Sequence, residues 1–391
     1  MKNWYDLIVV GAGPAGSWTA KYAAENGASV LMLEKDREVG LPVRCAEGVA
    51  EKSLKDLVDV RESWIAQVIT GGRLISPNGT EITAFPDERG YILHRKVFDA
   101  DLAKMAAEAG AEVVTKAYVK SLIQEDGRIA GVQVEHLGKS YDIHCKIVIG
   151  ADGVESRVGR WAGLKVHIPP SEMESCAQMT LANIDIHASD VYFFFGDAVA
   201  PGGYLWIFPK GERTANVGLG ISGIYSKKKK AIDYLREFVD RKFPDASILT
   251  LVAGGVPTCP QPKEIVADGV ILVGDAARQT NPISGGGIIN AMIAGKIAGE
   301  VAAKAIKKGD VSAKQLQPYA KQFYKAEGKV NDLSYKLKKV IYSFSDEKLD
   351  RIAEKLSTMD PKKITPYQLF KTALWENPKL LVDAAAIFLR G

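Results

Sequence analysis

The N-terminal part of the chain alternates short apolar runs with an amphipathic stretch. Residues 6–10 and 29–33 are almost entirely apolar, and residues 15–26 follow a helical period after the glycine turn GAGPAG. Short apolar runs bounded by turn residues are typical of buried parallel strands, whereas a period of about 3.6 residues indicates a helix. The order strand, helix, strand therefore predicts a βαβ unit.

Alternation with a period of two residues, which indicates strands, dominates the middle of the chain. The extended runs 65–76 and 80–85 flank the turn sequence PNGT and predict a hairpin. After a helical stretch at 95–109, strand pairs broken by EDGR and LGKS end in the apolar run KIVIG. From about 174 to 256 the pattern is again mostly strand, with a helix at 230–243. These strands predict a mostly antiparallel sheet.

The last third of the chain returns to an α/β pattern and then becomes helical. The apolar run VILV precedes GDAAR and a long helix of small residues, GGGIINAMIAGKIAGEVAAKAI, and lysine-rich amphipathic helices follow. The whole pattern predicts an α/β (α+β) protein with a doubly wound, Rossmann-like domain, an inserted antiparallel-sheet substrate domain and a helical C-terminus. The expected bounds are 1–60, 91–165 and 257–310 for the first domain, 61–90 and 166–256 for the second, and 311–391 for the third.

Composition supports a globular protein and narrows its surroundings. The 391 residues are 47% hydrophobic and 25% charged, which is typical of a soluble protein of two or three domains. The N-terminus carries no signal-peptide pattern and the four cysteines have no metal or redox spacing, so we expect a cytoplasmic protein. No run approaches the roughly 18 apolar residues of a membrane span. The dispersed histidines predict no metal site: His94, His136, His144, His167 and His187.

Charge is distributed unevenly along the chain. The net charge is +4, but 18 Lys and Arg stand against 10 Asp and Glu from Val301 onward. Such a tail can dock on anionic lipid at the inner face of a membrane or on an acidic electron carrier, although a solvated helical face is the commoner case. The lysine run 227–230 could bind an acidic electron carrier, or it could be the solvated start of a helix. The terminal sequence LLVDAAAIFLRG is either an interfacial helix or a helix docked on its own domain, and Asp383 favours docking. We expect no nucleic-acid partner.

The glycine turn after the first strand is a candidate nucleotide site. Gly11, Gly13 and Gly16 fit G-x-G-x-x-G, and Glu34 follows at the end of the next strand. Gly11 permits the tight turn, Gly13 lets backbone approach a pyrophosphate, and Gly16 allows close packing of helix and strand. The Glu34 carboxylate can accept hydrogen bonds from ribose hydroxyls and would repel a 2′-phosphate. This favours FAD or NAD over NADP.

A second candidate nucleotide element follows the strand VILV. Asp275, in GDAAR, lies where a carboxylate can hold a polyol chain while the following amides face a flavin ring. The same residue could instead be a helix N-cap. Two nucleotide elements far apart in one chain favour a long ligand, so we prefer FAD to NAD.

The stretch PGGYLWIFP places aromatic residues at every second position. If it is a strand, Tyr204, Trp206 and Phe208 share one face, and Leu205 and Ile207 face the other way. We call Tyr204, Trp206 and Phe208 the aromatic column. An ordinary half-buried strand would also explain the pattern.

Six motifs, taken together, resemble those of the geranylgeranyl reductase family, and within it the archaeal-type enzymes that saturate digeranylgeranylglycerophospholipids. They are GAGPAG, GLPVRCAEG, LHRKVFD, GADGVESRVGR, PGGYLWIFP and GDAARQTNPISGGGI. The aromatic stretch matches the family pattern P-x-x-Y-x-W-x-F-P at every fixed position. The resemblance implies the fold of the p-hydroxybenzoate hydroxylase group of flavoproteins. It extends to about Lys304, and the tail beyond matches no motif.

The resemblance implies FAD as the cofactor and an oxidoreductase of isoprenoid ether-lipid biosynthesis. The substrate would be a prenyl lipid, and electrons would come from a ferredoxin-like protein, F420H2 or NAD(P)H. The glycines 285–287, including Gly286, would allow close approach to the isoalloxazine. The residues implied to contact FAD are Ala15, Glu34, Cys45, Ala46, Gly48, Arg95, Val119, Asp275, Gly287 and Ile288.

The chemistry of alkene reduction gives the aromatic column a role. An isolated alkene is not polarised, so hydride from a reduced flavin adds only if positive charge can develop on the other carbon. Aromatic faces stabilise such charge by about 1 to 2 kcal/mol per ring, and they also bind an apolar chain. We therefore expect Tyr204, Trp206 and Phe208 to line a prenyl site, with Tyr204 and Trp206 acting in catalysis.

Three further features each have two interpretations. Cys45 could tune the flavin or assist proton delivery, or it could be a small contact whose backbone meets FAD. Arg44 could offset the negative charge of a reduced flavin or pair with a surface acid. The segment Ala151-Asp152-Gly153, with Ser156 and Arg157, could bind cofactor or cap a helix.

Two other functions fit the same nucleotide signals. An aromatic hydroxylase or halogenase of the same fold would use NAD(P)H and dioxygen on a compact aromatic substrate. A non-catalytic lipid-binding flavoprotein would keep FAD without turnover. The complete aromatic motif favours the reductase.

Overall fold

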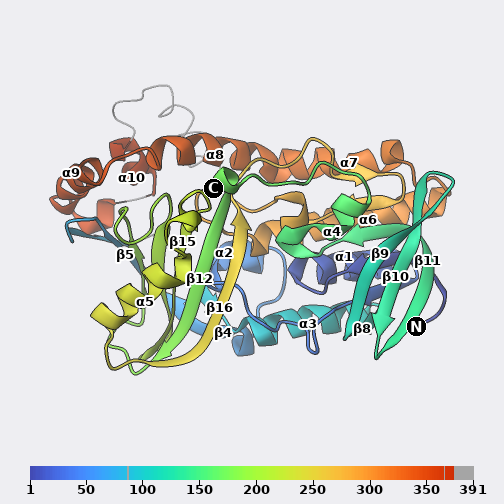
Figure 1. Ribbon diagram of the computed structural model, residues 1–391, viewed down its shortest axis with the longest axis horizontal. Coiled ribbons are helices and arrows are strands. Elements are labelled where there is room, and N and C mark those ends of the chain that lie inside the picture. Colours follow the sequence, from blue (N-terminus) through green and yellow to red (C-terminus); the bar gives the residue numbers. More distant parts are fainter. Residues whose placement is uncertain (86–87, 365, 374–391) are drawn as a thin grey trace. The chain divides into compact units, whose positions relative to one another are not determined.

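The computed structural model describes residues 1–85, 88–364 and 366–373 (Figure 1). They form two compact units, each assembled from three separate segments. The first unit contains residues 1–43, 95–168 and 259–331, and the second contains 44–94, 169–258 and the chain from 332 onward. These units divide the chain at other places than the domains expected from the sequence. Residues 44–60 group with the antiparallel sheet, and the C-terminal helices are shared between the units.

A parallel sheet forms the centre of the first unit. Its strand order is β18-β11-β1-β2-β8, all parallel, with β17 antiparallel at the edge next to β18. The apolar side chains of β1 and β2 are buried, as continuous apolar runs predict for a parallel sheet. The bounds are β1 Trp4–Val10, β2 Val30–Leu33, β8 Glu112–Val114, β11 Lys139–Gly150, β17 Val266–Ala267 and β18 Val270–Leu272.

Two antiparallel strands and a set of helices complete this unit. Strands β9 (Ala117–Glu125) and β10 (Arg128–His136) continue from β11 with the turns that EDGR and LGKS predict. The succession of β1, α1 and β2 confirms the predicted βαβ unit. The helices are α1 Pro14–Glu25, α3 Arg95–Glu108, α4 Arg157–Trp161, α6 Ile288–Lys308 and α7 Ala313–Phe323.

Two glycines let helices α1 and α6 approach each other closely. A Cβ atom added to Gly295 would lie 2.6 Å from the carbonyl oxygen of Ala15, and one added to Gly299 would lie 2.7 Å from that of Thr19. Carbon and oxygen atoms do not approach so closely without a bond, so the observed packing requires glycine at both positions. This packing buries Trp18 and fixes the helix that carries the glycine turn at its N-terminus.

The second unit contains a seven-stranded and a three-stranded sheet. The larger has the order β16-β12-β15-β14-β13-β5-β6 and is antiparallel except between β13 and β5, and the smaller has the order β3-β7-β4. The larger sheet comprises β5 Gly71–Ile75, β6 Glu81–Ala84, β12 Met173–Ala182, β13 Asp190–Phe194, β14 Tyr204–Gly211, β15 Thr214–Ser222 and β16 Ser247–Pro257. The smaller comprises β3 Gly48–Ala50, β4 Ile65–Ile69 and β7 Gly90–Leu93.

The sequence prediction was wrong in one strand of this unit. The run expected at 65–76 is two strands in two sheets, because β4 pairs with β7 while β5 pairs with β13 and β6. The chain changes sheets at Thr70, whose amide donates to the carbonyl of Ser189. Alternation within one strand carries no information on its partner, so the change was not visible. The hairpin at PNGT is confirmed by the antiparallel pair β5 and β6.

Helices cover parts of these sheets. On one face of the larger sheet, Leu235 and Phe238 of α5 share a buried core with Leu205 and Ile207. Helix α9 packs Ala353 against β6 in a separate small core. The bounds are α2 Glu51–Lys55, α5 Ala231–Lys242, α8 Lys329–Ile341, α9 Asp346–Ser357 and α10 Pro366–Ala373.

Within the described chain, no helix combines the length and the apolar character that crossing a bilayer requires. The terminal sequence LLVDAAAIFLRG, with Asp383, lies outside the described residues.

Replacing Gly295 by Ala should lower the free energy of unfolding by about 1 to 3 kcal/mol, because the added methyl group meets backbone rather than a movable side chain. This loss should outweigh the gain of roughly 1 kcal/mol in helix propensity. Urea unfolding measures the change. Lys304→Ala, at an exposed position of the same helix, should stay within about 0.5 kcal/mol of the unaltered protein. An unchanged unfolding midpoint for Gly295→Ala would show that α1 and α6 can separate at no cost.

Candidate functional site

The glycine turn after β1 has the geometry of a nucleotide-binding turn. Gly11 has φ +104°, and a Cβ atom on it would lie 2.3 Å from the carbonyl oxygen of Ala151. A Cβ atom on Gly16 would lie 1.9 Å from the carbonyl oxygen of Gly11. Gly13 is the N-cap of α1 in an extended conformation, and no described atom lies within 4 Å of the place its Cβ would take. Packing therefore requires glycine at positions 11 and 16, whereas Gly13 leaves space in front of the helix N-terminus.

Glu34 is held beside this turn. Its two carboxylate oxygens accept hydrogen bonds from the amides of Ala12 at 2.9 Å and Asp36 at 3.0 Å. Each oxygen keeps a lone pair, so ribose hydroxyls can still donate to the carboxylate. The Glu34 carbonyl accepts the amide of Ala117 at 2.8 Å, which brings the start of β9, and with it the buried Val119, to the same end of the sheet.

Asp275 and Arg95 form the second polar element of this unit. Asp275 lies in a 3₁₀ turn, Gly274–Ala277, directly after β18, and its Oδ1 accepts the Thr280 hydroxyl at 2.6 Å. Burial raises the pKa of Asp275, while the Thr280 hydrogen bond and the charge of Arg95 oppose the rise. Arg95 itself makes a bidentate ion pair with Asp99, with both bonds at 2.7 Å.

The glycines before α6 adjoin Asp275. Gly287 is the N-cap of α6, and a Cβ atom on it would lie 3.4 Å from Asp275 Oδ1. Gly285 has φ +67°, and Ile288 is the first residue of the helix. Asp275 therefore caps neither this helix nor its own turn, which begins after Val273. A carboxylate beside an open helix N-terminus suits a polar group of an extended ligand.

The segment after β11 caps a helix. Asp152 Oδ2 accepts the amide of Val158 in α4 at 2.9 Å, and the Ser156 hydroxyl donates to the carbonyl of Ala276 at 2.9 Å. The capping interpretation of this segment is therefore confirmed for one carboxylate oxygen. Oδ1 of Asp152 is buried and has no hydrogen-bond partner among the described residues.

In the second unit, strand β14 presents the aromatic column on one face. Tyr204, Trp206 and Phe208 are half-buried, whereas Leu205 and Ile207 are completely buried against the α5 side. The alternation predicted from PGGYLWIFP is therefore confirmed. The rings of Tyr204 and Trp206 meet edge to face, with centroids 6.0 Å apart.

Two phenylalanines that sequence reasoning missed extend the aromatic column. The Phe193 ring centroid lies 5.6 Å from those of Tyr204 and Phe208, and Phe195 lies 6.3 Å from Tyr204. Phe194, between them, points to the opposite face and packs on Phe238 of α5. The alternation in VYFFF was the signal that could have identified them.

The indole of Trp206 packs over a glycine of the neighbouring strand and holds a loop through hydrogen bonds. Its partner in β15 is Gly218, and a Cβ atom there would lie 2.5 Å from the indole. The indole Nε1 donates to Gln178 Oε1 at 3.0 Å, and Gln178 Nε2 donates to the carbonyl of Cys45 at 2.9 Å. The Cys45 thiol accepts the amide of Glu47 at 3.2 Å. The loop that contains Cys45 and Ala46 is thus attached to the ring side of the sheet.

A buried acid holds the next part of that loop. Glu47 is 3% exposed and has φ +75°. Its Oε2 accepts Asn216 Nδ2 at 2.6 Å and forms an ion pair with Lys210, whose Nζ also donates to the carbonyl of Leu93 at 3.2 Å. Gly48 follows, and a Cβ atom on it would lie 2.9 Å from the Phe208 ring. Sequence reasoning placed Ala46 and Gly48 at the site but missed this anchor.

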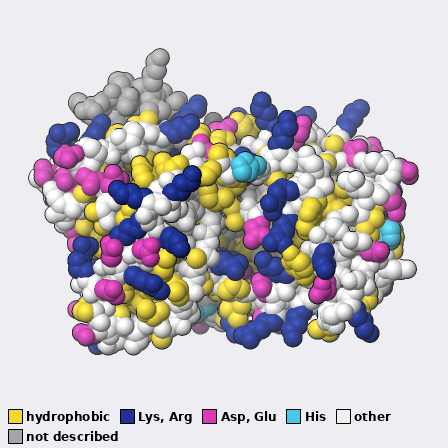
Figure 2. All heavy atoms as spheres, in the orientation of Figure 1, with side chains coloured by type: hydrophobic (Ala, Val, Ile, Leu, Met, Phe, Trp, Pro, Cys, Tyr) yellow, Lys and Arg dark blue, Asp and Glu magenta, His cyan; other side chains and the backbone are white. Residues whose placement is uncertain are grey.

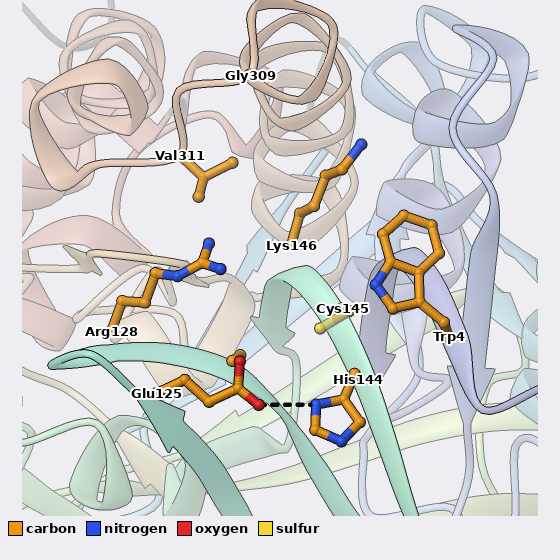
Figure 3. A pocket seen from close by; sticks show the side chains of 9 residues that line it. Trp4, Glu125, Arg128, His144, Cys145, Lys146, Gly309 and Val311 are labelled. Carbon is orange, nitrogen blue, oxygen red and sulfur yellow. Dashed lines mark ion pairs between the residues drawn. The ribbon is translucent and has the colours of Figure 1, made fainter.

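A hollow of about 410 Å³ on the first unit lies away from the glycine turn (Figure 3). Trp4, Arg128 and Lys146 line it, and His144 Nδ1 lies 3.2 Å from Glu125 Oε1 within it. Trp4 begins β1, whereas the glycine turn follows the other end of this strand. The hollow is therefore distinct from the nucleotide element.

Comparison with known proteins decides the family. Residues 172–256 match the geranylgeranyl reductase catalytic domain, and residues 5–201 match an FAD binding domain. The chain is 48% identical over 394 residues to digeranylgeranylglycerophospholipid reductase 1 of Methanococcoides burtonii, covering 99% of this chain and 96% of that protein. This chain belongs to the geranylgeranyl reductase family. The resemblance seen in the sequence is confirmed, and FAD is the cofactor that the matched domain binds.

Other matches agree with this geranylgeranyl reductase assignment. The digeranylgeranylglycerophospholipid reductase of Methanosarcina acetivorans is 47% identical over 395 residues, covering 99% of this chain and 97% of that protein. A geranylgeranyl bacteriochlorophyll reductase-like crystal structure from Thermoplasma acidophilum matches with a TM-score of 0.91 and 35% identity, covering 98% of this chain and 99% of that one.

The same fold occurs in enzymes of other activity. A flavin-dependent brominase matches with a TM-score of 0.73 and 20% identity, covering 96% of this chain and 100% of the brominase chain. The predicted fold class is therefore confirmed. At this identity the likeness concerns the fold alone and does not support a hydroxylase or halogenase activity. The family match favours the reductase over this alternative.

Gly13→Ala should weaken FAD binding without changing stability. The N-cap has φ −69° and ψ −178°, which alanine adopts readily, and its Cβ would enter open space in front of the helix. We expect the Kd for FAD to rise about tenfold or more, equal to about 1.4 kcal/mol, because the methyl group occupies the approach to the pyrophosphate. Titration of the apoprotein with FAD and its thermal unfolding give the two quantities.

Gly16→Ala provides the contrast for this experiment. Its Cβ would collide with the Gly11 carbonyl, so both unfolding temperature and FAD affinity should fall. Unaltered FAD binding in Gly13→Ala would show that the turn does not approach the pyrophosphate.

Proposed function

We propose that this chain is an FAD-dependent reductase that saturates C=C bonds of geranylgeranyl chains in isoprenoid ether lipids such as digeranylgeranylglycerophospholipid. The observation that carries the proposal is the aromatic column of β14, which lies within the residues that match the family's catalytic domain. Reduced FAD supplies the hydride for such a reaction, and a proton completes it.

The residues of the first unit fit an extended dinucleotide. Gly11, Gly13, Ala15 and Gly16 would present the turn and the helix N-terminus to the pyrophosphate, and Glu34 would accept hydrogen bonds from ribose hydroxyls. Asp275, Arg95 and the glycines before Ile288 would bind polar groups nearer the flavin, and Val119 would offer backbone at the adenine end. The half-buried Asp275 supports this assignment, since a carboxyl beside the open N-terminus of α6 can exchange hydrogen bonds with a hydroxyl-rich ligand.

The aromatic column and its neighbours would bind the prenyl chain. Apolar ring faces exclude water and gain roughly 0.8 kcal/mol per CH₂ group buried. Their π faces stabilise positive charge as it develops on an alkene carbon, and this stabilisation is greater where water is excluded. Tyr204 and Trp206 would thus act in catalysis, and Phe208 in binding.

Cys45 is proposed as a contact of the cofactor through its loop. Its carbonyl and thiol already accept hydrogen bonds from Gln178 and from the amide of Glu47. These bonds support a positioning role for the loop, in which Ala46 and Gly48 would offer backbone to FAD. Arg44, exposed and lying 3.7 Å from the Cβ position of Gly254, would contribute positive charge at the same loop.

The reaction requires an electron donor and access to lipid. A ferredoxin-like protein, F420H2 or NAD(P)H would supply the electrons. We propose a peripheral position at the inner face of the cell membrane, supported by the excess of Lys and Arg after Val301. On the face shown in Figure 2, Lys and Arg side chains are interspersed with Asp and Glu, which favours a weak, salt-sensitive contact.

Anaerobic incubation with a digeranylgeranyl phospholipid tests the function. The flavin is first reduced with dithionite, and the lipid is then examined by mass spectrometry. Stepwise gain of two hydrogens together with flavin reoxidation is the expected result. Retention of reduced flavin and of an unaltered lipid would contradict the proposal and favour a lipid-binding flavoprotein without turnover.

Trp206→Leu should lower the rate constant for lipid reduction about tenfold to thirtyfold, equal to about 1.4 to 2 kcal/mol, and leave the FAD content unchanged. The cause is the loss of a π face beside the alkene. Stopped-flow reoxidation of the reduced flavin by lipid measures the rate. Phe194→Leu is the matched control, because this ring belongs to the adjacent strand but packs on the opposite face. Equal losses of FAD and of rate in Trp206→Leu would instead indicate that the indole only supports the core.

A further inference from the structure

A second buried charged cluster lies at the Tyr204 end of the aromatic column. Glu174 in β12 is 6% exposed and Lys338 in α8 is 7% exposed. Their Oε1 and Nζ atoms are 3.0 Å apart. The ammonium also donates to the hydroxyl of Thr258 at 2.6 Å and to its carbonyl at 3.4 Å. Lys338 is therefore well satisfied, and it engages only one of the two carboxyl oxygens of Glu174.

The other oxygen of Glu174 is buried without a partner. Oε2 makes no hydrogen bond to any part of the chain that the structure describes. It lies 3.9 Å from the place a Cβ on Gly220 would occupy and 3.2 Å from that of Gly203. A buried oxygen left in this state costs free energy, so an ion pair built for stability alone would be expected to engage both oxygens.

The sheet register places this oxygen on the same face as the rings. Gly220 pairs with Tyr204 on one side and with Cys176 on the other. Side chains of directly paired residues project to the same face of a sheet. A row across three strands therefore contains Tyr204, the space left by the absent side chain of Gly220, and Cys176. Glu174 lies two residues before Cys176 and therefore faces the same way. Its free oxygen is directed to the end of the aromatic column.

The surroundings favour the neutral form of this carboxyl. Burial raises the pKa of Glu174, and the charge of Lys338 and the hydrogen bond from Thr258 oppose the rise. The other titratable groups that face it are Cys176 on the same strand, Tyr204 of β14 and Tyr342 after α8. Burial raises the pKa of each of these three groups as well. Glu174 is thus the carboxyl of the cluster that keeps its proton to a higher pH than an ordinary glutamate does.

We propose that Glu174 is the proton donor for the prenyl double bond that lies against the Tyr204 end of the aromatic column. The O–H bond at Oε2 breaks, and its proton forms a C–H bond with one alkene carbon while a hydride from the reduced cofactor adds to the other carbon. The π electrons of the double bond form the C–H bond to the proton, which leaves positive charge on the second carbon. The ring faces stabilise this charge until the hydride supplies the electron pair of the second C–H bond. Lys338 and Thr258 stabilise the carboxylate that remains, and water returns the proton after product leaves.

This inference rests on the proposed reductase function and adds the missing proton source. General acid catalysis typically contributes a factor of 10² to 10⁴ when the pKa of the acid lies near the working pH. Burial raises the pKa of Glu174 and so shifts this acid toward the working pH. The rings of the aromatic column exclude water that would otherwise compete for the proton.

Glu174→Gln tests the proposal, since the amide keeps the shape but has no proton to give. With flavin reduced beforehand under anaerobic conditions, the rate of its reoxidation by digeranylgeranyl phospholipid should fall at least 100-fold. FAD content and the affinity for the lipid, measured by quenching of tryptophan fluorescence, should stay unchanged. Glu172→Gln is the matched control, because this acid lies two residues away and bonds to Tyr335 instead of Lys338, so its rate should remain within twofold.

The pH profile and infrared spectra separate a proton donor from a structural acid. In the unaltered enzyme the rate should fall as pH rises through the raised pKa of Glu174, and this limb should vanish in Glu174→Gln. An infrared band of a protonated carboxyl should persist above the pH at which an ordinary glutamate ionises, and it should disappear in the variant. If Glu174→Gln does not fold, Glu174→Gln with Lys338→Met removes the unpaired buried charge and is measured in the same way.

The outcomes are distinguishable from failure of the proposed function. Absence of lipid reduction by the unaltered enzyme would overturn the reductase function and this inference with it. Lipid reduction by the unaltered enzyme with a rate within threefold for the Glu174→Gln variant would overturn the proton donor alone. The proton donor would also be overturned if the variant lost activity 100-fold but its remaining rate still fell with rising pH as in the unaltered enzyme, since another group would then supply the proton.

Discussion

The ring side of the antiparallel sheet depends on the missing side chain of Gly218. An indole atom of Trp206 lies only 2.5 Å from the position that the Cβ of any other residue would take at 218, so a side chain there would collide with the ring. In this place its Nε1 donates to Gln178, and Gln178 in turn donates to the carbonyl of Cys45. A methyl group at this one position would thus displace a ring, its hydrogen bond and the anchor of a loop. Strand, ring and loop are therefore a single arrangement rather than three independent features.

Features encoded by neighbouring residues could be predicted from the sequence. The face of each ring follows from the period of two in PGGYLWIFP, because successive side chains of a strand point to opposite sides. The βαβ unit and the roles of Gly11 and Gly16 follow in the same way from a strand, a glycine turn and a helix in direct succession. These inferences needed no knowledge of which strand lies beside which.

Features that join distant segments could not be predicted. Gln178 and Cys45 are separated by 133 residues, and Glu47 and Lys210 by 163. Nothing in the sequence around Gln178 distinguishes it from a polar residue on an exposed strand. The break of the run 65–76 into β4 and β5 has the same cause, because strand pairing is decided by partners that are remote in the chain. A positive φ at a non-glycine residue, as at Glu47, is likewise imposed by its partners.

The two ends of the aromatic column show how the same pair of residue types can serve different purposes. At the Phe208 end, Oε2 of Glu47 is shared by Asn216 and Lys210, so the acid holds a loop in place. At the Tyr204 end, Lys338 engages one oxygen of Glu174 and the other remains buried without a partner. An unpolarised double bond cannot attract a proton strongly, so an acid that acts on it must lie close and must not spend its proton on a competing acceptor. The unsatisfied oxygen is therefore a cost to the fold that the chemistry of the proton transfer explains, whereas the satisfied acid at the other end needs no such explanation.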